Sequence, residues 1–247
     1  MINIFVVGIS GKMGANILAC AEDCDDIVVT GGLDSVKSDR VPTFSRAADV
    51  NVPIDVIVDF SRPETLNEIV SLAERYRCPV VLATTGYDEA QLQKIKALSS
   101  RCGVLHSGNM SLGVNLLTGL VKKAAAVLDG FDIEIVEKHH NKKVDAPSGT
   151  ALMLAEAVKK DDNFIVSGRS GKSTKRDPKE IGISSVRGGT IVGEHDVMFI
   201  GDDEIVTISH TALSRKLFAR GAIKAARFMV GKTSGMYDMN DVLDLRF

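Results

Sequence analysis

The sequence predicts an α/β fold in two parts: a parallel sheet covered by helices, and an α+β domain with a mixed sheet. Up to about residue 110, continuous apolar strands alternate with amphipathic helices, which is typical of parallel sheets buried on both faces. From residue 131, strands of period two follow one another with almost no helix between them, which indicates hairpins and an antiparallel or mixed sheet. The chain of 247 residues, 45% of them hydrophobic, is long enough for one or two such domains.

The first part contains five expected strands, at 2–7, 26–34, 55–61, 79–86 and 103–110. Helices are expected after the first, third, fourth and fifth strands, at about 11–24, 63–77, 88–100 and 111–128. Pro63 supports the second helix because proline is favoured in a first helical turn.

The second part contains four expected strands, at 131–140, 181–189, 190–200 and 204–212. One helix is expected near Ser148, and a last helix at 214–230 should return to the first domain. The predicted boundaries are 1–110 with 216–247 for the first domain and 111–215 for the second.

Charge and composition argue against a nucleic-acid or membrane partner. The formal net charge is -2, so no overall attraction to either is expected. The first apolar run has no basic region before it and ends at a glycine after a few residues, too early for a signal peptide or a membrane span. We therefore expect a cytoplasmic protein. The polar segment 169–180 is expected to be a mobile, solvated loop, with a lid as the alternative.

The four cysteines predict neither a metal site nor a disulfide framework. Cys20, Cys24, Cys78 and Cys102 form no CxxC pair, and no histidine cluster lies beside them at zinc spacing. We expect buried or half-exposed free thiols and no metal ligands.

Three glycines follow the first strand at the spacing GxxGxxG. In this pattern a tight turn brings backbone N–H groups at a helix N-terminus close to a pyrophosphate. Gly8, Gly11 and Gly14 lie between a strand and a helix, and Asp34 ends the second strand, where a carboxylate would bind the adenine ribose. The first domain is therefore expected to be Rossmann-like and to bind a dinucleotide. Asp34 favours NADH because a carboxylate repels a 2′-phosphate, with NADPH use left open.

Two further strand ends carry candidate cofactor residues. The turns ATTG, 83–86, and SGNMS, 107–111, follow predicted strands at the edge where ligands of open α/β sheets bind. Ordinary turns with serine or threonine caps are an equally compatible interpretation.

The segment EKHHNKKVDAPSGTA, residues 137–151, joins a strand end to a helix start. Ser148 is the expected N-cap, and the backbone N–H groups of Gly149 and Thr150 would point out of the helix toward a carboxylate or phosphate. Only one of the neighbours His139 and His140 should face this site, because adjacent residues of a strand point in opposite directions.

Histidine and lysine beside an anion site indicate proton chemistry. Histidine titrates near neutral pH and lysine stabilises a developing negative charge, so His139, His140, Lys142 and Lys143 are the candidates. Asp145 is expected to pair with a neighbouring cation. The other histidines, His106, His195 and His210, are scattered and expected to be structural.

The segment 137–151, together with GISGKMG, ATTG, SGNMSLGVN and RGGTIVGEH, closely resembles the dihydrodipicolinate reductase family of lysine biosynthesis. The likeness covers nearly the whole chain. It implies a Rossmann-like nucleotide domain and an α+β mixed-sheet domain that binds substrate and builds a homotetramer. It also implies reduction of a cyclic dicarboxylate, 4-hydroxy-tetrahydrodipicolinate, to tetrahydrodipicolinate with NADH or NADPH.

The resemblance also implies roles for single residues. His139 would donate or accept a proton, and Lys143 would donate one. The residues implied in substrate binding are His140, Ser148, Gly149 and Thr150. The residues implied in cofactor binding are Gly8, Ile9, Ser10, Gly11, Lys12, Met13, Asp34, Ala83, Thr84, Thr85, Ser107, Gly108, Asn109 and Met110. Ser35 follows Asp34 where relatives sometimes have arginine, which again favours NADH.

Three alternatives are kept. One is another two-domain amino-acid dehydrogenase of the aspartate or homoserine type. A second is a dinucleotide sensor without catalysis, which the presence of His139 and Lys143 disfavours. A third is nucleic-acid binding through 169–176, which the balanced charge disfavours.

Overall fold

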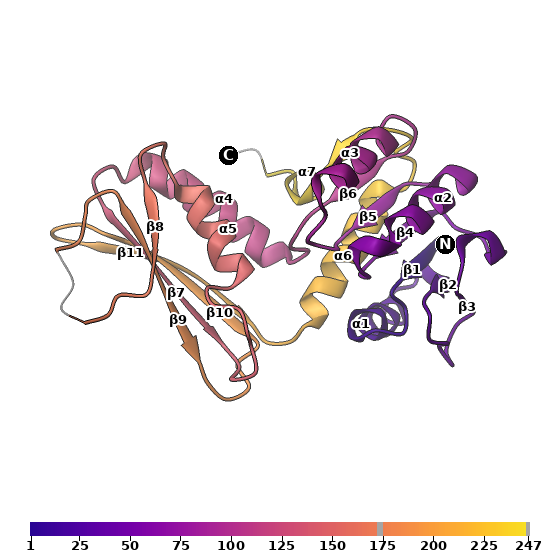
Figure 1. Ribbon diagram of the computed structural model, residues 1–247, viewed down its shortest axis with the longest axis horizontal. Helices are drawn as coiled ribbons and strands as arrows, with labels where there is room; N and C mark the ends of the chain where they lie inside the picture. Colours follow the sequence, from indigo (N-terminus) through magenta and orange to yellow (C-terminus); the bar gives the residue numbers. More distant parts are fainter. Residues whose placement is uncertain (172–174, 246–247) are drawn as a thin grey trace. The chain divides into compact units, whose positions relative to one another are not determined.

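The computed structural model describes residues 1–171 and 175–245, which form two compact units (Figure 1). The first unit consists of Met1–Leu112 and Arg215–Asp244, and the second is built from Gly113–Ser214. The first boundary falls two residues later than expected and the second one residue earlier. Leu245 groups with the second unit, and Asp244 before it is the C-cap of α7 with φ 50°. The expected placement of 246 and 247 lies outside the described residues.

The first unit contains a seven-stranded sheet in the order β12-β6-β5-β4-β1-β2-β3, and every pairing in it is parallel. The strands are β1 Ile2–Val7, β2 Ile27–Leu33, β3 Thr43–Phe44, β4 Val56–Asp59, β5 Val80–Leu82, β6 Val104–His106 and β12 Met236–Tyr237. The helices are α1 Lys12–Ala21, η1 Ala47–Asp49, η2 Pro63–Thr65, α2 Leu66–Tyr76, α3 Glu89–Leu98, α6 Lys216–Met229 and α7 Met239–Leu243. The predicted parallel sheet is confirmed, while the short β3, β12 and α7 were not predicted.

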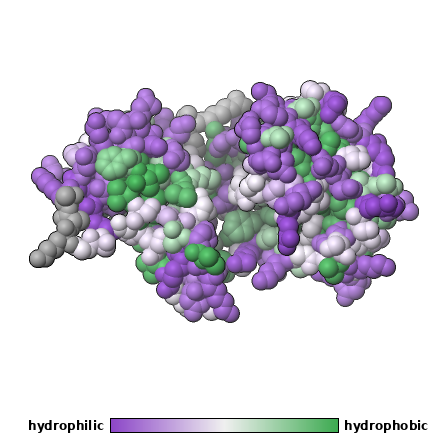
Figure 2. Space-filling model, in the orientation of Figure 1, coloured by the Kyte–Doolittle hydropathy of each residue, from purple (hydrophilic) through white to green (hydrophobic). Residues whose placement is uncertain are grey.

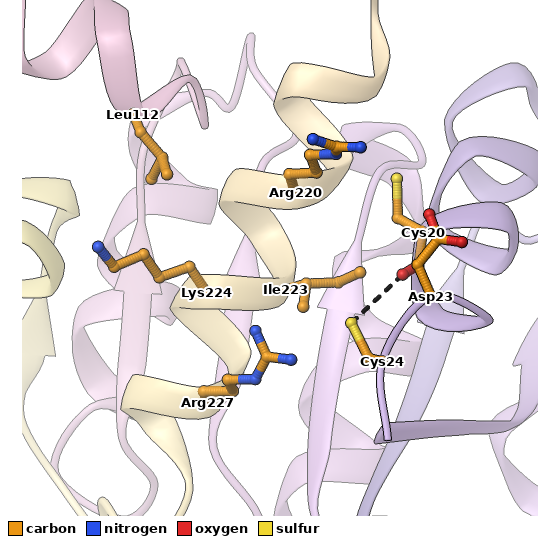
Figure 3. Close-up of a pocket in the computed structure, with 8 residues that line it drawn as sticks. All are labelled: Cys20, Asp23, Cys24, Leu112, Arg220, Ile223, Lys224 and Arg227. Atoms are coloured by element: carbon orange, nitrogen blue, oxygen red, sulfur yellow. Dashed lines mark hydrogen bonds between the residues drawn. The ribbon is translucent and has the colours of Figure 1, made fainter. Parts of the chain in front are cut away.

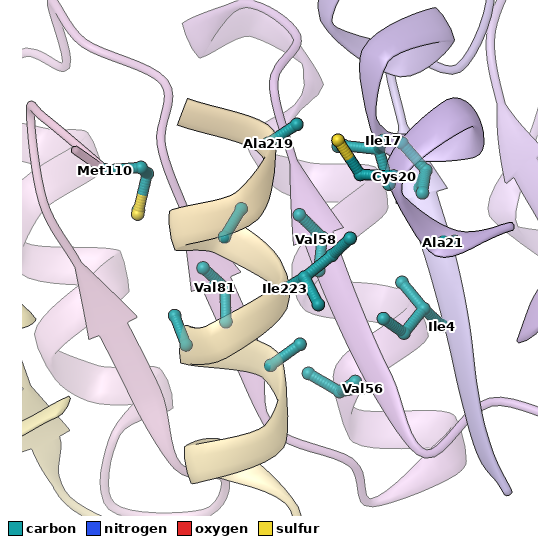
Figure 4. Packing of buried hydrophobic residues seen from close by; sticks show 14 of the residues in the cluster. Ile4, Ile17, Cys20, Ala21, Val56, Val58, Val81, Met110, Ala219 and Ile223 are labelled. Atoms are coloured by element: carbon teal, nitrogen blue, oxygen red, sulfur yellow. The ribbon is translucent and has the colours of Figure 1, made fainter. Parts of the chain in front are cut away.

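Helices cover both faces of this sheet, as its continuous apolar strands require. On one face, Ile4, Val58 and Val81 pack against α1 and α6 (Figure 4). On the other face, Phe5 and Ile57 belong to a second cluster that includes α2 and α3. Alternation along each strand therefore supplies two separate cores, and the carboxyl ends of the strands are left for the loops that carry the candidate site.

The second unit contains a mixed five-stranded sheet in the order β11-β10-β7-β9-β8. Its strands are β7 Asp132–His139, β8 Phe164–Ser167, β9 Glu180–Arg187, β10 Gly193–Ile200 and β11 Ile205–Ala212, and its helices are α4 Leu112–Val127 and α5 Gly149–Val158. The expectation of hairpins between consecutive strands is confirmed for β10 and β11, which the turn Gly201–Asp203 joins. It is wrong for β9 and β10, because both strands pair with β7, on its opposite edges and with opposite directions.

Among the described residues of this unit, helices cover only one face of the sheet. Ile135, Val197 and Phe199 are buried in a cluster with residues of α4 and α5. On β10 the alternate residues Asp196 and Met198 are only partly buried. The visible surface of this unit shows a hydrophobic area among hydrophilic residues (Figure 2). Among the described residues, no helix has the length and apolar composition needed to cross a bilayer.

Candidate functional site

The glycine loop after β1 has the geometry of a phosphate cradle. Gly8 has φ +84°, and a Cβ there would lie 2.8 Å from the carbonyl oxygen of Phe60. A Cβ at Gly14 would lie 2.1 Å from the carbonyl oxygen of Ile9. Helix α1 begins after Gly11, whose missing side chain makes no capping hydrogen bond, so first-turn N–H groups are available to an anion. These residues fit the pyrophosphate of a dinucleotide.

Asp34 connects the end of β2 to this loop. Its Oδ2 accepts the N–H of Ser10 at 3.0 Å, and its Oδ1 accepts the N–H of Val36 at 3.2 Å. The hydroxyl of Ser10 donates to the carbonyl of Val36 at 2.6 Å. Each carboxylate oxygen has a further lone pair, so Asp34 is oriented to accept hydrogen bonds from ribose hydroxyls.

Two adjoining pockets lie along this edge of the sheet and share Phe60, Ser61 and Arg62. The larger, of about 670 Å³, is also lined by Gly8 and Asp34. The smaller, of about 350 Å³, is lined by the predicted residues Ala83, Thr84 and Thr85. The glycine loop, the ribose carboxylate and the first predicted turn therefore lie along one groove of the first unit.

The second predicted turn lines neither of these pockets. Ser107 and Asn109 close it through their own hydrogen bonds, with the Ser107 hydroxyl donating to the Asn109 carbonyl at 3.0 Å. Met110 is 1% exposed and packs in the core, as does Ile9. Met110 and Ile9 can therefore reach a cofactor only through their backbones. Lys12 and Met13 begin α1 and also line neither pocket.

Asp59, at the end of β4, was not singled out in the sequence. Its carboxylate is fully buried and accepts the N–H of Ser61 at 2.9 Å and the hydroxyl of Tyr87 at 3.1 Å. Burial raises the pKa of Asp59 against the effect of these hydrogen bonds. The position of Ser61 between the two pockets is thus tied to the end of a core strand.

A separate pocket of about 580 Å³ in the first unit is lined by residues of α1, of the turn after it and of α6, together with Leu112 (Figure 3). It contains Cys20 and Cys24, and the thiol of Cys24 donates to the carbonyl of Cys20 at 3.3 Å. The guanidinium of Arg227 is held by Asp26 at 2.7 and 2.8 Å. None of the predicted site residues lines this pocket. All four cysteines are free thiols, as predicted.

In the second unit, the candidate anion site lies at the start of α5, which follows β7 in the chain. Ser148 is the N-cap of α5, and its hydroxyl oxygen accepts the N–H of Ala151 at 3.1 Å. Gly149 is exposed, and a Cβ built on it would meet no other part of the described chain within 4 Å apart from its own helix and chain neighbours. The predicted anion site at this helix start therefore has the expected cap and an accessible backbone.

His139 is the histidine of the pair that is held on the inner side of β7. It is 9% exposed, and its Nδ1 lies 2.6 Å from Oε2 of the fully buried Glu137. Burial lowers the pKa of His139, and the hydrogen bond that its Nδ1 donates to Glu137 only partly opposes this. His140 follows the strand end and is half-buried.

Lys143 forms an ion pair with Asp145, at 2.7 and 2.8 Å from the two carboxylate oxygens. The hydrogen bond from Lys143 holds the pKa of Asp145 below its usual value. The charge of Lys143 also contributes to lowering the pKa of His139 and of His195, although burial is the main cause for both. Asp145 has the cation partner that the sequence suggested.

His195 was expected to be structural, but it contacts two predicted site residues. Its Nε2 lies 3.0 Å from the hydroxyl of Ser148, and its ring makes an edge contact with His139 at 5.2 Å between centroids. Burial and then the neighbouring His139 lower the pKa of His195 to about 4. The sequence offered no signal for this role, because His195 lies on β10, 47 residues beyond Ser148.

The ends of segment 169–180 are anchored by ion pairs. Arg169 pairs with Glu180, and Arg176 pairs with Asp132 and Glu134 at the start of β7. Most of the described residues of this segment are exposed, as expected for a solvated loop, whereas Arg176 is partly buried against the carboxylates of β7. Residues 172–174 lie outside the described part of the chain.

The fold and the two sets of residues define a class of protein. One unit offers a dinucleotide groove with a ribose carboxylate, and the other offers an anion-binding helix start beside a histidine and a lysine. Among the described residues, no group of three or more metal-ligating side chains is arranged to hold an ion. These are the parts of a two-domain, dinucleotide-dependent oxidoreductase that acts on an anionic small molecule.

Comparison with known proteins gives the particular family. Two family models match, dihydrodipicolinate reductase, N-terminus, over residues 2–110 and dihydrodipicolinate reductase, C-terminus, over residues 113–243. The 4-hydroxy-tetrahydrodipicolinate reductases of Clostridium novyi (strain NT) and Caldanaerobacter subterraneus subsp. tengcongensis are 45% and 47% identical, with 98% of both chains covered. The chain belongs to the dihydrodipicolinate reductase family, which confirms the resemblance noted in the sequence.

A solved structure supports the fold. The dipicolinate-bound dihydrodipicolinate reductase from Paenisporosarcina sp. TG-14 aligns with a TM-score of 0.78 at 24% identity, with 98% of each chain covered. The predicted fold class, a Rossmann-like domain with a mixed-sheet domain, is confirmed by this likeness and by the two sheets.

Proposed function

We propose that this protein reduces 4-hydroxy-tetrahydrodipicolinate, through the dihydrodipicolinate formed by loss of water, to tetrahydrodipicolinate. The observation that carries the proposal is the helix start at Ser148 with His139 and Lys143 beside it, in a chain of this family. The substrate is a cyclic dicarboxylate and needs an anion site together with a proton donor. The other amino-acid dehydrogenases and the silent sensor are not favoured by this combination.

The groove of the first unit suits NADH or NADPH, which when bound supplies a hydride to the substrate ring. The N–H groups at the start of α1 would hold the pyrophosphate, and Asp34 would accept hydrogen bonds from the ribose hydroxyls. The acidic side chain at this position is the reason to expect a preference for NADH.

The second unit supplies binding and the proton. The N–H groups of Gly149 and Thr150 and the hydroxyl of Ser148 hold one substrate carboxylate, and His140 contacts the substrate. The ring gains two electrons and one hydrogen as hydride, so one proton must follow to complete the reduction. His139 and Lys143 supply that proton, and the charge of Lys143 also stabilises the negative charge that develops before it arrives.

The proposal is tested by following NADH oxidation with freshly generated pathway intermediate. Replacing His139 with Gln or Lys143 with Ala should lower kcat by about 10²- to 10⁴-fold, because each removes a proton-transfer group. Lys142→Ala is the matched control, since Lys142 is a neighbouring but exposed lysine. Binding of NADH should be unchanged in all three variants. Normal turnover in both site variants would overturn the site assignment.

Two further properties are proposed with this function. The face of the second sheet that lacks helices is proposed to build a homotetramer, since its partly buried alternate residues, such as Met198, leave it available for another copy. The reaction is proposed to take place in the cytoplasm. This compartment contains the reduced nicotinamide cofactor, and its reducing conditions are compatible with four free thiols.

A further inference from the structure

Glu137 is the most completely buried charged group beside the candidate proton donor. It lies on the inner face of β7, two residues before His139, and its exposed fraction is 0%. A carboxylate in such a position is costly unless it is fully hydrogen-bonded. The hydrogen-bond partners of Glu137 therefore indicate its role.

One carboxylate oxygen of Glu137 serves the histidine and the other serves the anion site. Oε2 lies 2.6 Å from Nδ1 of His139, and Oε1 accepts the backbone N–H of Ser148 at 3.1 Å. The helix start and the proton-transfer ring are thus attached to a single side chain. Displacing Glu137 would move both at once.

Arg187, on β9, compensates the charge. Its Nη1 donates to Oε2 and its Nη2 to Oε1 of Glu137, each at 2.7 Å, in a bidentate pair. Nη2 also donates to the carbonyl of Asp145 at 2.6 Å, which anchors the loop that carries Lys143. Burial alone would raise the pKa of Glu137, but hydrogen bonds from Arg187, Ser185 and His139 outweigh it and hold the pKa at about 2. Glu137 is therefore ionised at neutral pH.

An ionised Glu137 can only accept hydrogen bonds, so Nδ1 of His139 must carry the hydrogen. In the neutral ring, Nε2 is then the nitrogen with the free lone pair, and in the charged ring Nε2 carries the proton to be transferred. A Cβ at Gly193 on β10 would lie 3.0 Å from this Nε2, so the absence of a side chain at this position leaves room for the ring.

We propose that Glu137 is a positioning residue of the reductase, which fixes the tautomer of His139 and holds the proton donor and the anion-binding helix start in one frame through its pair with Arg187. This inference rests on the proposed function, in which His139 transfers a proton. The tautomer fixed by Glu137 leaves Nε2 as the single nitrogen that can do so. It assigns Arg187 as the partner that keeps Glu137 charged and links the frame to the loop of Lys143.

The test compares two variants with opposite expected effects. The charged and titratable groups around His139 are Glu137 on its own strand, Arg187 on β9, His195 on β10 and Lys143 in the loop. The readout is the apparent pKa in the pH profile of kcat/KM that disappears in His139→Gln. Glu137→Gln should shift this pKa to lower pH, because an anion beside the ring is lost, and Arg187→Gln should shift it to higher pH, because a cation is lost.

The same variants should lower kcat/KM by about 10- to 100-fold, with NADH affinity unchanged. Glu180→Gln is the matched control, since Glu180 is a buried carboxylate paired with an arginine, Arg169, at the other end of β9. Its pH profile should be that of the unmodified enzyme. If Glu137→Gln does not fold, the pKa shift in Arg187→Gln still tests the proposal.

Failure of the proposed function and failure of the positioning role give different results. If the unmodified protein does not turn over the dicarboxylate, the proposed function is wrong. If it does, and both variants keep its pH profile and kcat/KM, or both shift the pKa in the same direction, the positioning role of Glu137 is overturned.

Discussion

At the residue scale, the hydrogen bond between His195 and Ser148 determines what the N-cap can offer a ligand. The Nδ1 atom of His195 is buried and has no hydrogen-bond partner in the described part of the chain. A buried N–H without a partner is rarer and more costly than an unfilled acceptor, so we assign the hydrogen to Nε2, which donates to the Ser148 hydroxyl. The proton of Ser148 is then available for a carboxylate at the start of α5.

His195 should also make the stability of the protein depend on pH. Its pKa is lowered to about 4 from 6.5, chiefly by burial. Between those values the unfolded chain binds a proton that the folded chain does not, so stability is fully present above pH 6.5 and falls as the pH falls toward 4. The loss is at most about 3 kcal/mol.

Urea unfolding at pH 7 and pH 5 measures this contribution. The free energy of unfolding should fall less between these two pH values in His195→Phe than in the unmodified protein, because the substituted side chain does not titrate. The comparison uses the change with pH within each protein, so an overall loss of stability in the variant does not affect it. An equal change in both proteins would contradict the assignment.

Asp34 should determine the choice of cofactor. The larger pocket is lined by Asp34, Glu64 and Glu68, with Arg62 as the cation among its lining residues. Three carboxylates disfavour a 2′-phosphate, so kcat/KM with NADH should exceed that with NADPH. Asp34→Asn should lower kcat/KM for NADH by about tenfold, because a charged hydrogen-bond acceptor is lost. The ratio of kcat/KM with NADH to kcat/KM with NADPH should therefore become smaller. Asp39 is an exposed neighbour, so Asp39→Asn should leave kcat/KM unchanged with either cofactor. A larger NADH-to-NADPH ratio of kcat/KM in Asp34→Asn would contradict the prediction.

At the element scale, the strand-to-helix turn after β1 depends on the absence of side chains. A Cβ at Gly14 would meet the backbone oxygen of Ile9 at 2.1 Å, whereas a Cβ at Gly11 would approach Gly8 only to 3.3 Å. Gly14→Ala must therefore move α1 away from β1, while Gly11→Ala fits after a small adjustment. The spacing of the glycines was visible in the sequence, but which glycine is under steric pressure was not.

Thermal unfolding of the two variants tests this difference. Gly14→Ala should destabilise the protein by about 1 to 3 kcal/mol, as overpacking of a close contact does, and should lower its Tm clearly. Gly11→Ala should have the smaller effect on Tm. The interpretation is wrong if the two substitutions lower Tm equally.

Element order was predictable only where neighbours in sequence are neighbours in the sheet. The β10–β11 hairpin follows from its short glycine-containing turn, and the parallel strands of the first unit follow from alternation with helices. The period-two pattern of β9 and β10 is equally compatible with a hairpin and with pairing to either edge of β7. The structure has the second arrangement, which brings Arg187 and His195 to either side of His139.

At the scale of the whole molecule, the helix-free face of the second sheet predicts self-association. Light scattering after size-exclusion chromatography should give a mass near four times the 26.5 kDa of one chain. Met198→Glu, on that face, should reduce the mass because it places a charge within the proposed interface. Val127→Glu, at an exposed position 71% accessible at the end of α4, is the control and should leave the mass unchanged. A monomer at all concentrations would contradict the proposal.

The sequence by itself determined the two-part fold class, the glycine loop with Asp34, and the histidine and lysine beside the helix start at Ser148, because each depends on residues close together in the chain. Only the tertiary structure revealed Glu137 as a shared anchor, with Arg187 and His195 as its neighbours across the sheet. These contacts join residues about 50 positions apart, and their geometry depends on strand order and register. Short-range periodicity carries no information about which distant strands become neighbours. That pairing places Arg187 beside Glu137, which in turn is proposed to fix the tautomer of His139.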